Sequence, residues 1–542
     1  MSICSRLLAV GSYVGLSCAL VGTACNGNSS RSRDAALPDA ASEVFPVGDA
    51  SEVATDSASD AAVRSTPVGN TGELAWVQPT VGSSDNQPFG MAVTTSGAFV
   101  VGGKYERAIK LAPDSAAPVS FTAKGQYDLW LARWQNDGTF SWARAAGTSV
   151  QSMVSAVGPA PGDDVYIGGT TYAYPKDTLV LGAGEPNQAT FTRYGTFFAR
   201  YHADGSLVWA KIQENGGNPY RMLPAPDGGF FAVGAVESFA ATFGVGEPHQ
   251  TTLIPRTVPS STPTFVARFA ADGQLAWVRT LGGIGPDAAL MADGGLVVVG
   301  TFGGETAVFE GGGVPDVSLV ADWLDLFVAS YSSAGDLRWI KAVTGPPQVA
   351  PQAVTVLASG DIVVAASCEP KTNATASPDN QAIFGPGEAN ETRITCTDFD
   401  LVYAGYAPDG HLVWAKSIPP LYPELRGLAP LADGGFVMAS TFRKTDPAIF
   451  DADTCGSLSL TRLTQDMNLV LSWHRPDGSA RIARVVATGW IEVLGLSVLA
   501  DGSVVFTGGF SDLTTFGPLD AAPVSYTKSG SNESTFLARL KP

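Results

Sequence analysis

The amino-acid sequence predicts an all-β fold made of seven repeats of one four-stranded antiparallel unit. Three observations support this prediction. A phrase that combines Asp-Gly with a following Trp returns at intervals of about 62 to 75 residues. Short apolar segments bracketed by Gly-rich turns fill each interval, and the periodicity of amphipathic helices is almost absent. The two ends of the chain carry complementary fragments of the unit. Self-similarity at this period indicates stacked supersecondary units.

The repeated phrase is clearest at residues 203–211, ADGSLVWAK, and at residues 271–279, ADGQLAWVR. Asp-Gly favours a tight turn between two strands, because the positive φ angles of such turns cost least at Asn, Asp and Gly. The tryptophans share one position on the outermost strand, where a large ring would fill the space between diverging sheets. They are Trp76, Trp142, Trp209, Trp277, Trp339 and Trp414, with Ile482 in a weaker copy.

One complete unit can be followed in the third copy. Residues 221–223 are expected to form strand A, and residues 230–234 strand B after a tight turn. A long connection leads to strand C at residues 265–269, and a second tight turn leads to strand D at residues 275–279. Strand B recurs at residues 98–103, 165–169, 296–300, 362–366, 436–440 and 504–508, which gives seven copies.

The two ends of the chain predict a closed ring. Residues 535–540 are expected to form the C strand of a last copy that lacks its D strand. Residues 72–77 are expected to form a D strand that precedes the first copy. Pairing these segments would remove two exposed sheet edges, which otherwise promote aggregation. Four-stranded antiparallel sheets repeated around a closed ring form a β-propeller. We therefore predict a seven-bladed β-propeller over residues 71–542, closed by pairing of the N-terminal strand with the C-terminal blade.

The pattern resembles the seven-bladed β-propeller repeats of secreted and surface bacterial proteins. Those repeats combine an apolar A strand, an Asp-Gly or Ser-Gly turn, a B strand that ends in Gly, an Asp-x-Phe-Val-Ala-Lys/Arg strand and a Gly-x-Leu strand. The Asp of this pattern is present at Asp128, Asp325 and Asp400. The resemblance covers about 470 residues. It implies the fold and not the activity, because propellers host many unrelated functions.

The N-terminal region predicts export. An apolar run at residues 7–24 ends in small residues directly before Cys25, which is typical of a lipoprotein signal over residues 1–25 with Cys25 as the lipidated residue. Simple secretion and an uncleaved anchor are the alternatives. Residues 26–70 are rich in Ser, Ala, Asp and Pro and are expected to form a disordered tether. We therefore expect an extracytoplasmic protein, lipid-anchored in the bacterial cell envelope or secreted.

Charge and cysteine content restrict the partners further. The net charge of −18 disfavours nucleic acid, because affinity for phosphates depends on Lys and Arg. In an oxidising compartment Cys368 and Cys396 are expected to form a disulfide. Cys455 is then left as a free thiol or as the partner of a neighbouring blade. We expect a monomer.

No metal and no cofactor are expected. Neither a CxxC motif nor a Cys/His cluster indicates a zinc site. Two acidic pairs offer oxygen ligands for calcium, Asp163-Asp164 and Asp451-Ala452-Asp453, but neither has a complete ligand set.

Topology predicts where a ligand would bind. With strands A and C antiparallel to B and D, the A–B and C–D turns share one face, here called the turn face. The B–C and D–A connections share the opposite face, here called the connection face. Binding residues usually lie on variable loops held by a rigid scaffold, so the connection face is the candidate. Its candidate residues near the central channel are Asn218, Tyr220, Arg221, Asp287, Tyr422, Arg426 and Trp490, and Asn86 and Phe89 are expected to be exposed beside them.

Two hypotheses about function, from different classes, are compatible with the predicted propeller and its connection face. The first is a non-enzymatic scaffold that binds a protein or a glycan through the connection face. The alternative is a propeller hydrolase or lyase with carboxylates, Arg and Tyr in the channel mouth. An enzyme should show converging titratable groups, whereas a binding surface should show an aromatic rim. Arg221 and Arg426 could instead pair with neighbouring acids. The presence of only 4 His favours the scaffold.

Overall fold

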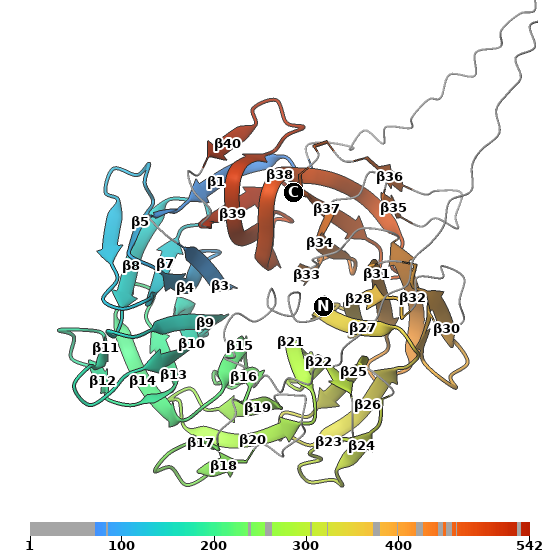
Figure 1. Cartoon of the computed structure of the whole chain (residues 1–542), viewed down its shortest axis with the longest axis horizontal. Coiled ribbons are helices and arrows are strands. Elements are labelled where there is room, and N and C mark those ends of the chain that lie inside the picture. The colour runs from blue at the N-terminus through green and yellow to red at the C-terminus, as the bar shows by residue number, and fades with distance from the viewer. Residues whose placement is uncertain are drawn as a thin grey trace, which may run out of the picture. The chain divides into compact units, whose positions relative to one another are not determined.

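Seven four-stranded antiparallel blades are arranged around a central axis in the part of the chain that the structure describes (Figure 1). The computed structural model describes residues 71–82, 85–236, 240–254, 263–303, 306–321, 324–371, 380–397, 399–418, 427–442, 448–450, 458–461, 463–464, 466–527 and 533–542. These residues belong to one unit, Arg64–Pro542. The predicted leader and tether, residues 1–70, lie outside the described residues. The all-β, seven-bladed prediction is confirmed.

Each blade has four strands, which run A, B, C and D from the channel outward (Figure 1). The A strands are β3 (Asn86–Val93), β9 (Ser152–Pro159), β15 (Asn218–Pro224), β21 (Ile284–Leu290), β27 (Gln348–Val356), β33 (Gly427–Pro430) and the second half of β38 (Ala480–Val498). The B strands are β4 (Phe99–Tyr105), β10 (Val165–Tyr172), β16 (Phe230–Ala235), β22 (Leu296–Gly303), β28 (Ile362–Glu369), β34 (Phe436–Phe442) and the first half of β39 (Val504–Phe516).

The outer half of each blade follows the same order. The C strands are β7 (Asp128–Trp134), β13 (Tyr194–Tyr201), β19 (Thr264–Phe269), β25 (Leu324–Tyr331), β31 (Asp400–Tyr406), β37 (Asn468–His474) and β41 (Ser534–Leu540). The D strands are β8 (Phe140–Ala146), β14 (Leu207–Glu214), β20 (Leu275–Leu281), β26 (Leu337–Val343), β32 (Leu412–Ile418), the first half of β38, and β1 (Leu74–Pro79).

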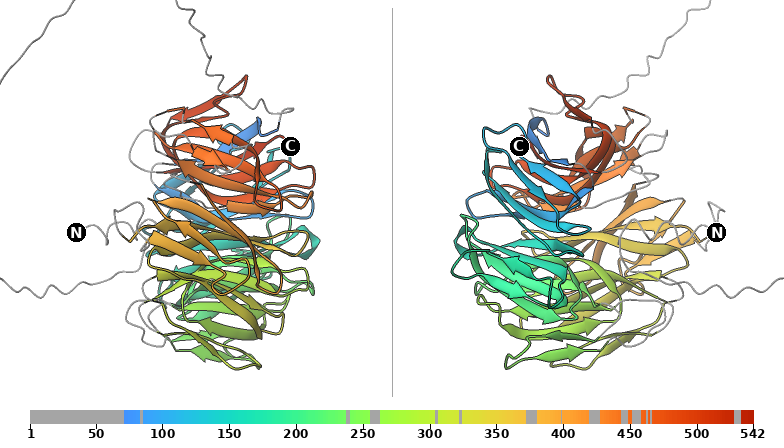
Figure 2. Two further views of the ribbon diagram at one scale, coloured as in Figure 1. Left: turned by 90° about the vertical axis from the view of Figure 1, so that its right-hand side faces the viewer. Right: turned by 60° about the vertical axis from the view of Figure 1, so that its left-hand side comes forward.

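The burial of the strands explains their sequences. The B and C strands are buried on both faces, as the patterns of β4 and β7 show, and they read as continuous apolar runs. A strands such as β3 alternate between buried and partly exposed positions, whereas D strands such as β26 are partly exposed along most of their length. Figure 2 views the ring from the side. The core therefore lies between the blades, where each sheet packs on the next.

Strand pairing closes the ring between the two ends of the described chain. Strand β1 pairs antiparallel with β41, so that Val77 lies opposite Ala538. Two backbone hydrogen bonds extend the pairing beyond the strands, from Gly72 N to Lys541 O at 3.1 Å and from Lys541 N to Glu73 O at 2.8 Å. Blade 7 therefore takes its D strand from the beginning of the chain, as the sequence predicted.

The long B–C connections differ from the expectation of extended loops on the connection face. Each contains a short hairpin that lies against the outer strands. The hairpins are β5 (Ala108–Leu111) with β6 (Val119–Thr122), β11 (Leu179–Leu181) with β12 (Ala189–Phe191), β17 (Ala241–Phe243) with β18 (Thr251–Leu253), β23 (Ala307–Phe309) with β24 (Val317–Leu319), β29 (Gln381–Phe384) with β30 (Thr392–Thr395), β35 (Ala448–Phe450) with β36 (Leu458–Leu460), and the end of β39 with β40 (Val524–Thr527).

Most of these hairpins pair with the D strand of the preceding blade or with the segment that follows it. Thr242 of β17 lies opposite Glu214 of β14, and Phe309 of β23 lies opposite Leu281 of β20. In the first blade β5 pairs with β2 (Val81–Gly82), which follows β1. The physical reason is that an outer strand leaves a row of unpaired backbone groups, and the hairpin satisfies part of that row. Most of the connection is therefore framework.

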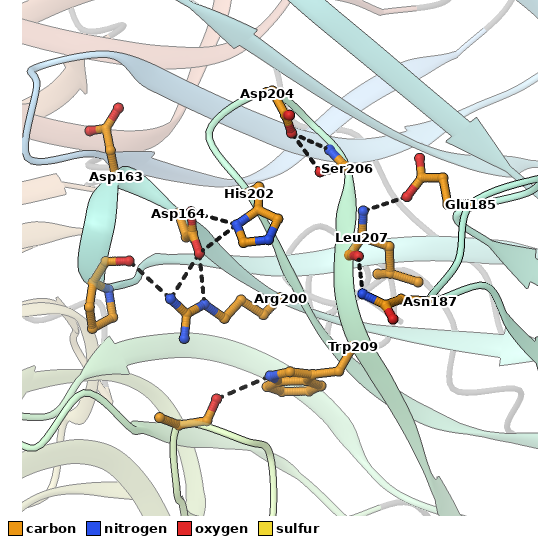
Figure 3. A network of polar contacts seen from close by, with 12 residues as sticks. Asp163, Asp164, Glu185, Asn187, Arg200, His202, Asp204, Ser206, Leu207 and Trp209 are labelled. Carbon is orange, nitrogen blue, oxygen red and sulfur yellow. Dashed lines mark hydrogen bonds and ion pairs between the residues drawn. The ribbon is translucent and has the colours of Figure 1, made fainter.

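An acidic residue at the hairpin tip joins two blades. Glu247 Oε2 accepts a hydrogen bond from Leu275 N at 2.6 Å, at the start of the D strand of its own blade. Glu247 Oε1 lies 2.7 Å from Lys211 Nζ of the preceding blade. The same arrangement recurs with Glu388, which binds Leu412 N at 2.7 Å and Lys341 Nζ at 2.6 Å. Glu185 likewise accepts from Leu207 N (Figure 3).

The repeated tryptophans lie between blades, as predicted. The Trp209 indole donates a hydrogen bond from Nε1 to Ala271 O of the next blade at 3.0 Å (Figure 3), and its ring lies against Gly273. Gly273 has a φ of +77°, and an added Cβ would lie 2.8 Å from the Trp209 ring. Where Ile482 replaces the tryptophan, its ladder partner Trp473 contacts the glycine, Gly72.

The structure contains a disulfide between Cys368, in β28, and Cys396, which directly follows β30. Both cysteines are buried, and the bond closes a loop of sequence separation 28 around the hairpin of blade 5. Cys455 lies outside the described residues. Within the ranges given above, the chain has no helix with the length and apolar character needed to cross a membrane.

Two matched glycine substitutions separate the role of the Trp209 contact from backbone strain. Gly246 has the same φ of +77° as Gly273, but an added Cβ would meet nothing within 4 Å. We expect Gly246→Ala to lower the free energy of unfolding by about 1 kcal/mol through its left-handed backbone. Gly273→Ala should lower it by about 2 to 4 kcal/mol, since it also displaces the indole. Equal losses in denaturant titrations would show that the indole contact contributes nothing.

Removal of the disulfide gives a second expected outcome. Replacing both cysteines by Ser releases a loop of sequence separation 28. The chain-entropy model then predicts a loss of about 3 to 4 kcal/mol in the free energy of unfolding. Guanidinium unfolding of the Cys368→Ser, Cys396→Ser variant, compared with the parent protein with and without reductant, measures this loss. Reductant should leave the variant unchanged.

Candidate functional site

The turn face is occupied by ion pairs between the blades' own residues. Arginines on C or D strands bind the aspartates of A–B turns in four blades, with the pairs Arg268–Asp227, Arg338–Asp293, Arg481–Asp433 and Arg539–Asp501. These pairs fix the turns against the strands.

Asp163 and Asp164 belong to the same network. Asp163 accepts hydrogen bonds from Ser96 N at 2.8 Å and from Arg133. Asp164 accepts from Arg200 Nε at 2.9 Å and lies 3.2 Å from His202 Nδ1 (Figure 3). Burial alone would raise the pKa of Asp163, but its hydrogen bonds lower that pKa to about 2. The possible calcium ligands therefore hold arginines instead. Asp451-Ala452-Asp453 lies outside the described residues.

A shallow depression of about 400 Å³ also lies on the turn face. It is lined by the ends of A strands and the first turn residues of blades 4, 5 and 6. These residues are Leu290, Met291, Ala292, Val356, Leu357, Ala358, Pro430, Leu431 and Ala432. All of their side chains are apolar, so this depression provides no acid, base or nucleophile.

Two of the predicted ligand-binding residues, Arg221 and Asp287, bind each other. Asp287 is 3% exposed, and its Oδ1 accepts from Arg221 Nε. Its Oδ2 accepts from Val354 N at 2.9 Å. The pKa of Arg221 is raised by the neighbouring Asp287 carboxylate. These contacts join the A strands of three consecutive blades. Of the two predictions for Arg221, the one in which it pairs with a neighbouring acid is therefore the one that the structure shows. A buried carboxylate held in this way belongs to the framework.

The other predicted residues have different surroundings. Asn218 and Tyr220 are half-buried in β15, where Tyr220 occupies a bulge in the pairing with β16. Trp490 is 47% exposed at the junction between blades 6 and 7. Tyr422 and Arg426 lie outside the described residues. Phe89 is half-buried, whereas Asn86 is fully buried and was wrongly expected near the surface.

The connection face carries polar and aromatic side chains at the strand ends and in the D–A connections of blades 7, 1 and 2, and this set is here called the connection rim. It combines carboxylates, amides, aromatic rings and one lysine, each near the end of a strand or in a D–A connection. The connection rim consists of Asp85, Gln87, Phe89, Lys104, Tyr127, Gln151, Tyr172, Tyr174, Tyr194, Trp490 and Glu533.

Lys104 is the unusual residue of the connection rim. In the pairing of B with C strands it occupies the position that holds a small residue in the other six blades, namely Thr170, Ala235, Thr301, Ser367, Thr441 and Gly509. Lys104 is 5% exposed, and its Nζ lies 4.9 Å from the ring centre of Tyr127 and 5.8 Å from that of Phe89. Such contacts stabilise a cation over aromatic faces.

Three carboxylates surround this lysine. Burial lowers the pKa of Lys104, and the charges of Asp85, Glu106 and Glu533 oppose that shift. Glu533 accepts from Gln87 Nε2 at 3.0 Å, and its own backbone N donates to Asp85 at 3.1 Å. The group therefore carries more negative than positive charge, and it links the C strand of blade 7 to the A and B strands of blade 1.

The connection rim continues into blade 2 through Gln151. The Tyr127 hydroxyl donates to Gln151 Oε1, and Gln151 O accepts from Tyr172 N at 3.0 Å. Tyr172 lies opposite Tyr194 in the ladder, with ring centres 4.7 Å apart. Tyr174, two residues further along, is 52% exposed. A chain of contacts thus leads from the buried lysine through Tyr127 and Gln151 to the pair of Tyr172 and Tyr194.

In the other direction the connection rim ends at Trp490. Trp490 lies opposite Ser511 in the ladder, beside a bulge that gives Asp512 a φ of 56°. A positive φ is unusual for a residue other than Gly, and such strain is frequent at functional sites. Leu513 next to it is exposed. Together these residues place an aromatic and an aliphatic side chain at the surface.

No protein-family model matches the chain, and no curated protein sequence matches it. Among solved structures, the chain is similar to a catalytically inactive virginiamycin B lyase from Staphylococcus aureus with quinupristin. The identity is 10% and the TM-score 0.37, over 85% of this chain and 99% of that chain. It is also similar to an ulvan lyase bound to a glucuronate and sulfated rhamnose unit, at 9% identity and TM-score 0.36, over 86% and 96%.

A third similar structure is the polysaccharide lyase Uly1, at 9% identity and TM-score 0.37, over 81% of this chain and 88% of that chain. At these values the likeness carries no argument about activity or substrate. The propeller fold of this chain rests on its own strand pairing.

The buried lysine gives a pH-dependent outcome. Because the pKa of Lys104 is lowered in the folded state, the unfolded chain binds more protons between the folded and the unfolded pKa. The free-energy cost of burying the charged Lys104 side chain is therefore present at neutral pH. This cost falls as the pH rises toward the pKa that Lys104 has in the unfolded chain. We expect the parent protein to gain stability relative to Lys104→Met as the pH rises toward about 10, the ordinary range of an unfolded lysine pKa. Urea midpoints of both proteins measure this, and a difference independent of pH would contradict it.

Proposed function

We propose that this protein is a binding module of the bacterial cell envelope that takes a protein or glycan ligand on its connection rim. The observation that carries the proposal is the concentration of aromatic and polar side chains across blades 7, 1 and 2, where Lys104 breaks the pattern of the other blades. Exposed aromatic side chains beside hydrogen-bonding groups are typical of recognition surfaces. On the turn face, by contrast, arginines bind most of the A–B turn aspartates.

The proposed location rests on the sequence of the first 70 residues. We propose that residues 1–25 direct export, that Cys25 carries the lipid, and that residues 26–70 hold the propeller clear of the membrane. The buried disulfide between Cys368 and Cys396 agrees with an oxidising compartment. Metabolic labelling with a radioactive fatty acid tests the anchor, since Cys25→Ser should lose the label. Retained label in that variant would place the lipid elsewhere or show another mode of attachment.

A second function, a hydrolase or lyase with its active site at the channel mouth, is favoured by one observation. Burial lowers the pKa of Lys104, and Tyr127 lies beside it, so a proton acceptor and a hydroxyl converge on the connection rim. In that case Lys104→Met should abolish product formation while leaving the fold intact. Product formation by the parent protein from an envelope polysaccharide, lost in this variant, would favour the enzyme over the binding module.

The binding proposal predicts loss of affinity in a rim variant. We expect Tyr174→Ala combined with Trp490→Ala to weaken binding of the full chain to its envelope ligand by about tenfold or more, because both rings are exposed. The matched control is Val245→Ala combined with Leu519→Ala, two exposed apolar residues at hairpin tips. Retention of envelope fractions on immobilised protein measures the difference. Equal retention by both double variants would move the ligand away from the connection rim.

A further inference from the structure

We propose that the connection rim binds an uncharged glycan, with Tyr172 and Tyr194 as the surface on which a sugar ring packs. The inference rests on the proposed function, since it names the ligand of the same rim. Tyr172 ends β10 and Tyr194 begins β13, so the ladder itself fixes the two rings at a centre distance of 4.7 Å and an angle of 47°. Both rings are partly exposed.

The chemistry of a sugar matches these side chains. A pyranose presents a face of C–H groups and an edge of hydroxyls, and it therefore needs an apolar plane beside hydrogen-bonding groups. Tyrosine supplies such a plane with a polar tip. Gln151 lies between Tyr127 and Tyr172, and its amide can both donate and accept. Gln87 and Glu533 extend the polar groups toward blade 7.

The charges of the connection rim select against acidic ligands. Lys104 is buried, and its charge is surrounded by those of Asp85, Glu106 and Glu533. The whole chain carries a net charge of −18. A uronate or sulfated polymer would therefore be repelled, most strongly at low ionic strength. An uncharged glycan meets no such penalty.

The spacing of the exposed rings favours a glycan over a protein partner. Stable protein interfaces bury about 800 Å² on each partner around an apolar centre. In the described part of the connection rim, Tyr174 and Trp490 lie on either side of blade 1, and the carboxylates and amides of blade 1 lie between them. A chain of hydroxyl-rich units can contact rings and amides in turn, whereas a flat apolar partner surface would desolvate the carboxylates.

The test is affinity electrophoresis of the full chain in gels that contain either neutral or acidic polysaccharides. We expect retardation by a neutral β-glucan, xyloglucan or mannan, and none by polygalacturonate or dextran sulfate. Tyr172→Ala with Tyr194→Ala should weaken the neutral interaction by about tenfold or more. Tyr174→Ala, at an exposed position, serves if the double variant fails to fold. Leu519→Ala is the matched control and should change affinity less than about twofold.

A charge variant tests the selectivity separately. Glu106→Gln removes one carboxylate near Lys104 at a residue outside the connection rim. It should leave neutral binding within about twofold and should raise retardation by acidic polymers at low salt. Retardation of the parent protein by acidic polymers alone would overturn the inference but leave a glycan-binding module. Capture of an envelope protein without any glycan binding would also overturn it, and absence of both would reject the proposed function as well.

Discussion

The outer edge of each sheet is the constraint on which the rest of this structure depends. A single blade cannot bury the two faces of its own sheet. The outer edge of its D strand also has no strand of the same blade to pair with. The following blade supplies the missing partner through its B–C hairpin, as Thr242 does opposite Glu214. The hairpin carboxylate then joins the two blades, since Glu247 binds Leu275 N and Lys211. Each blade is thereby held by contacts that only its neighbour can provide.

This arrangement explains where a site can form. The hairpins use most of the B–C connections as framework, and arginines bind most A–B turn aspartates on the turn face. The remaining variable positions are the strand ends at the connection face. There a single substitution of a small residue by Lys104 changes the environment of Phe89, Tyr127 and Glu533. A rigid scaffold with variation confined to one rim is a common basis for recognition.

The repeat unit could be predicted from the sequence because its signals are local. Asp-Gly turns, apolar B strands and the recurring tryptophans each depend on a few consecutive residues, and the closing strand at residues 72–77 follows from the same pattern. The hairpins were missed because strands of three residues, such as Ala241–Phe243, are too short to show a periodicity. The Gly-x-Gly-Glu sequence at residues 182–185, 244–247 and 385–388 was the available signal.

The site was predicted less well because contacts between blades are not encoded locally. Arg221 and Asp287 were both identified near the channel, but only the register of neighbouring A strands shows that they bind each other. Lys104 was missed because its position is recognisable only after the B and C strands are aligned by their pairing. Asn86 was expected near the surface, yet it lies fully buried at the start of β3, where Gly82 approaches its amide. The composition of a loop alone does not reveal that one of its residues is fully buried.

Closure by β1 has a consequence for the order of folding. Leu74 N binds Asp520 Oδ2 across a sequence separation of 446 residues, so blade 7 can form only after nearly the whole chain has been synthesised. Until β41 is available, β1 has no strand to pair with. Until β1 has paired with β41, the outer edge of blade 7 is exposed. Contacts of such long range form slowly, and an unpaired edge is prone to association with other chains. The interval between completion of blade 6 and the arrival of β41 is therefore the period when the protein most needs protection.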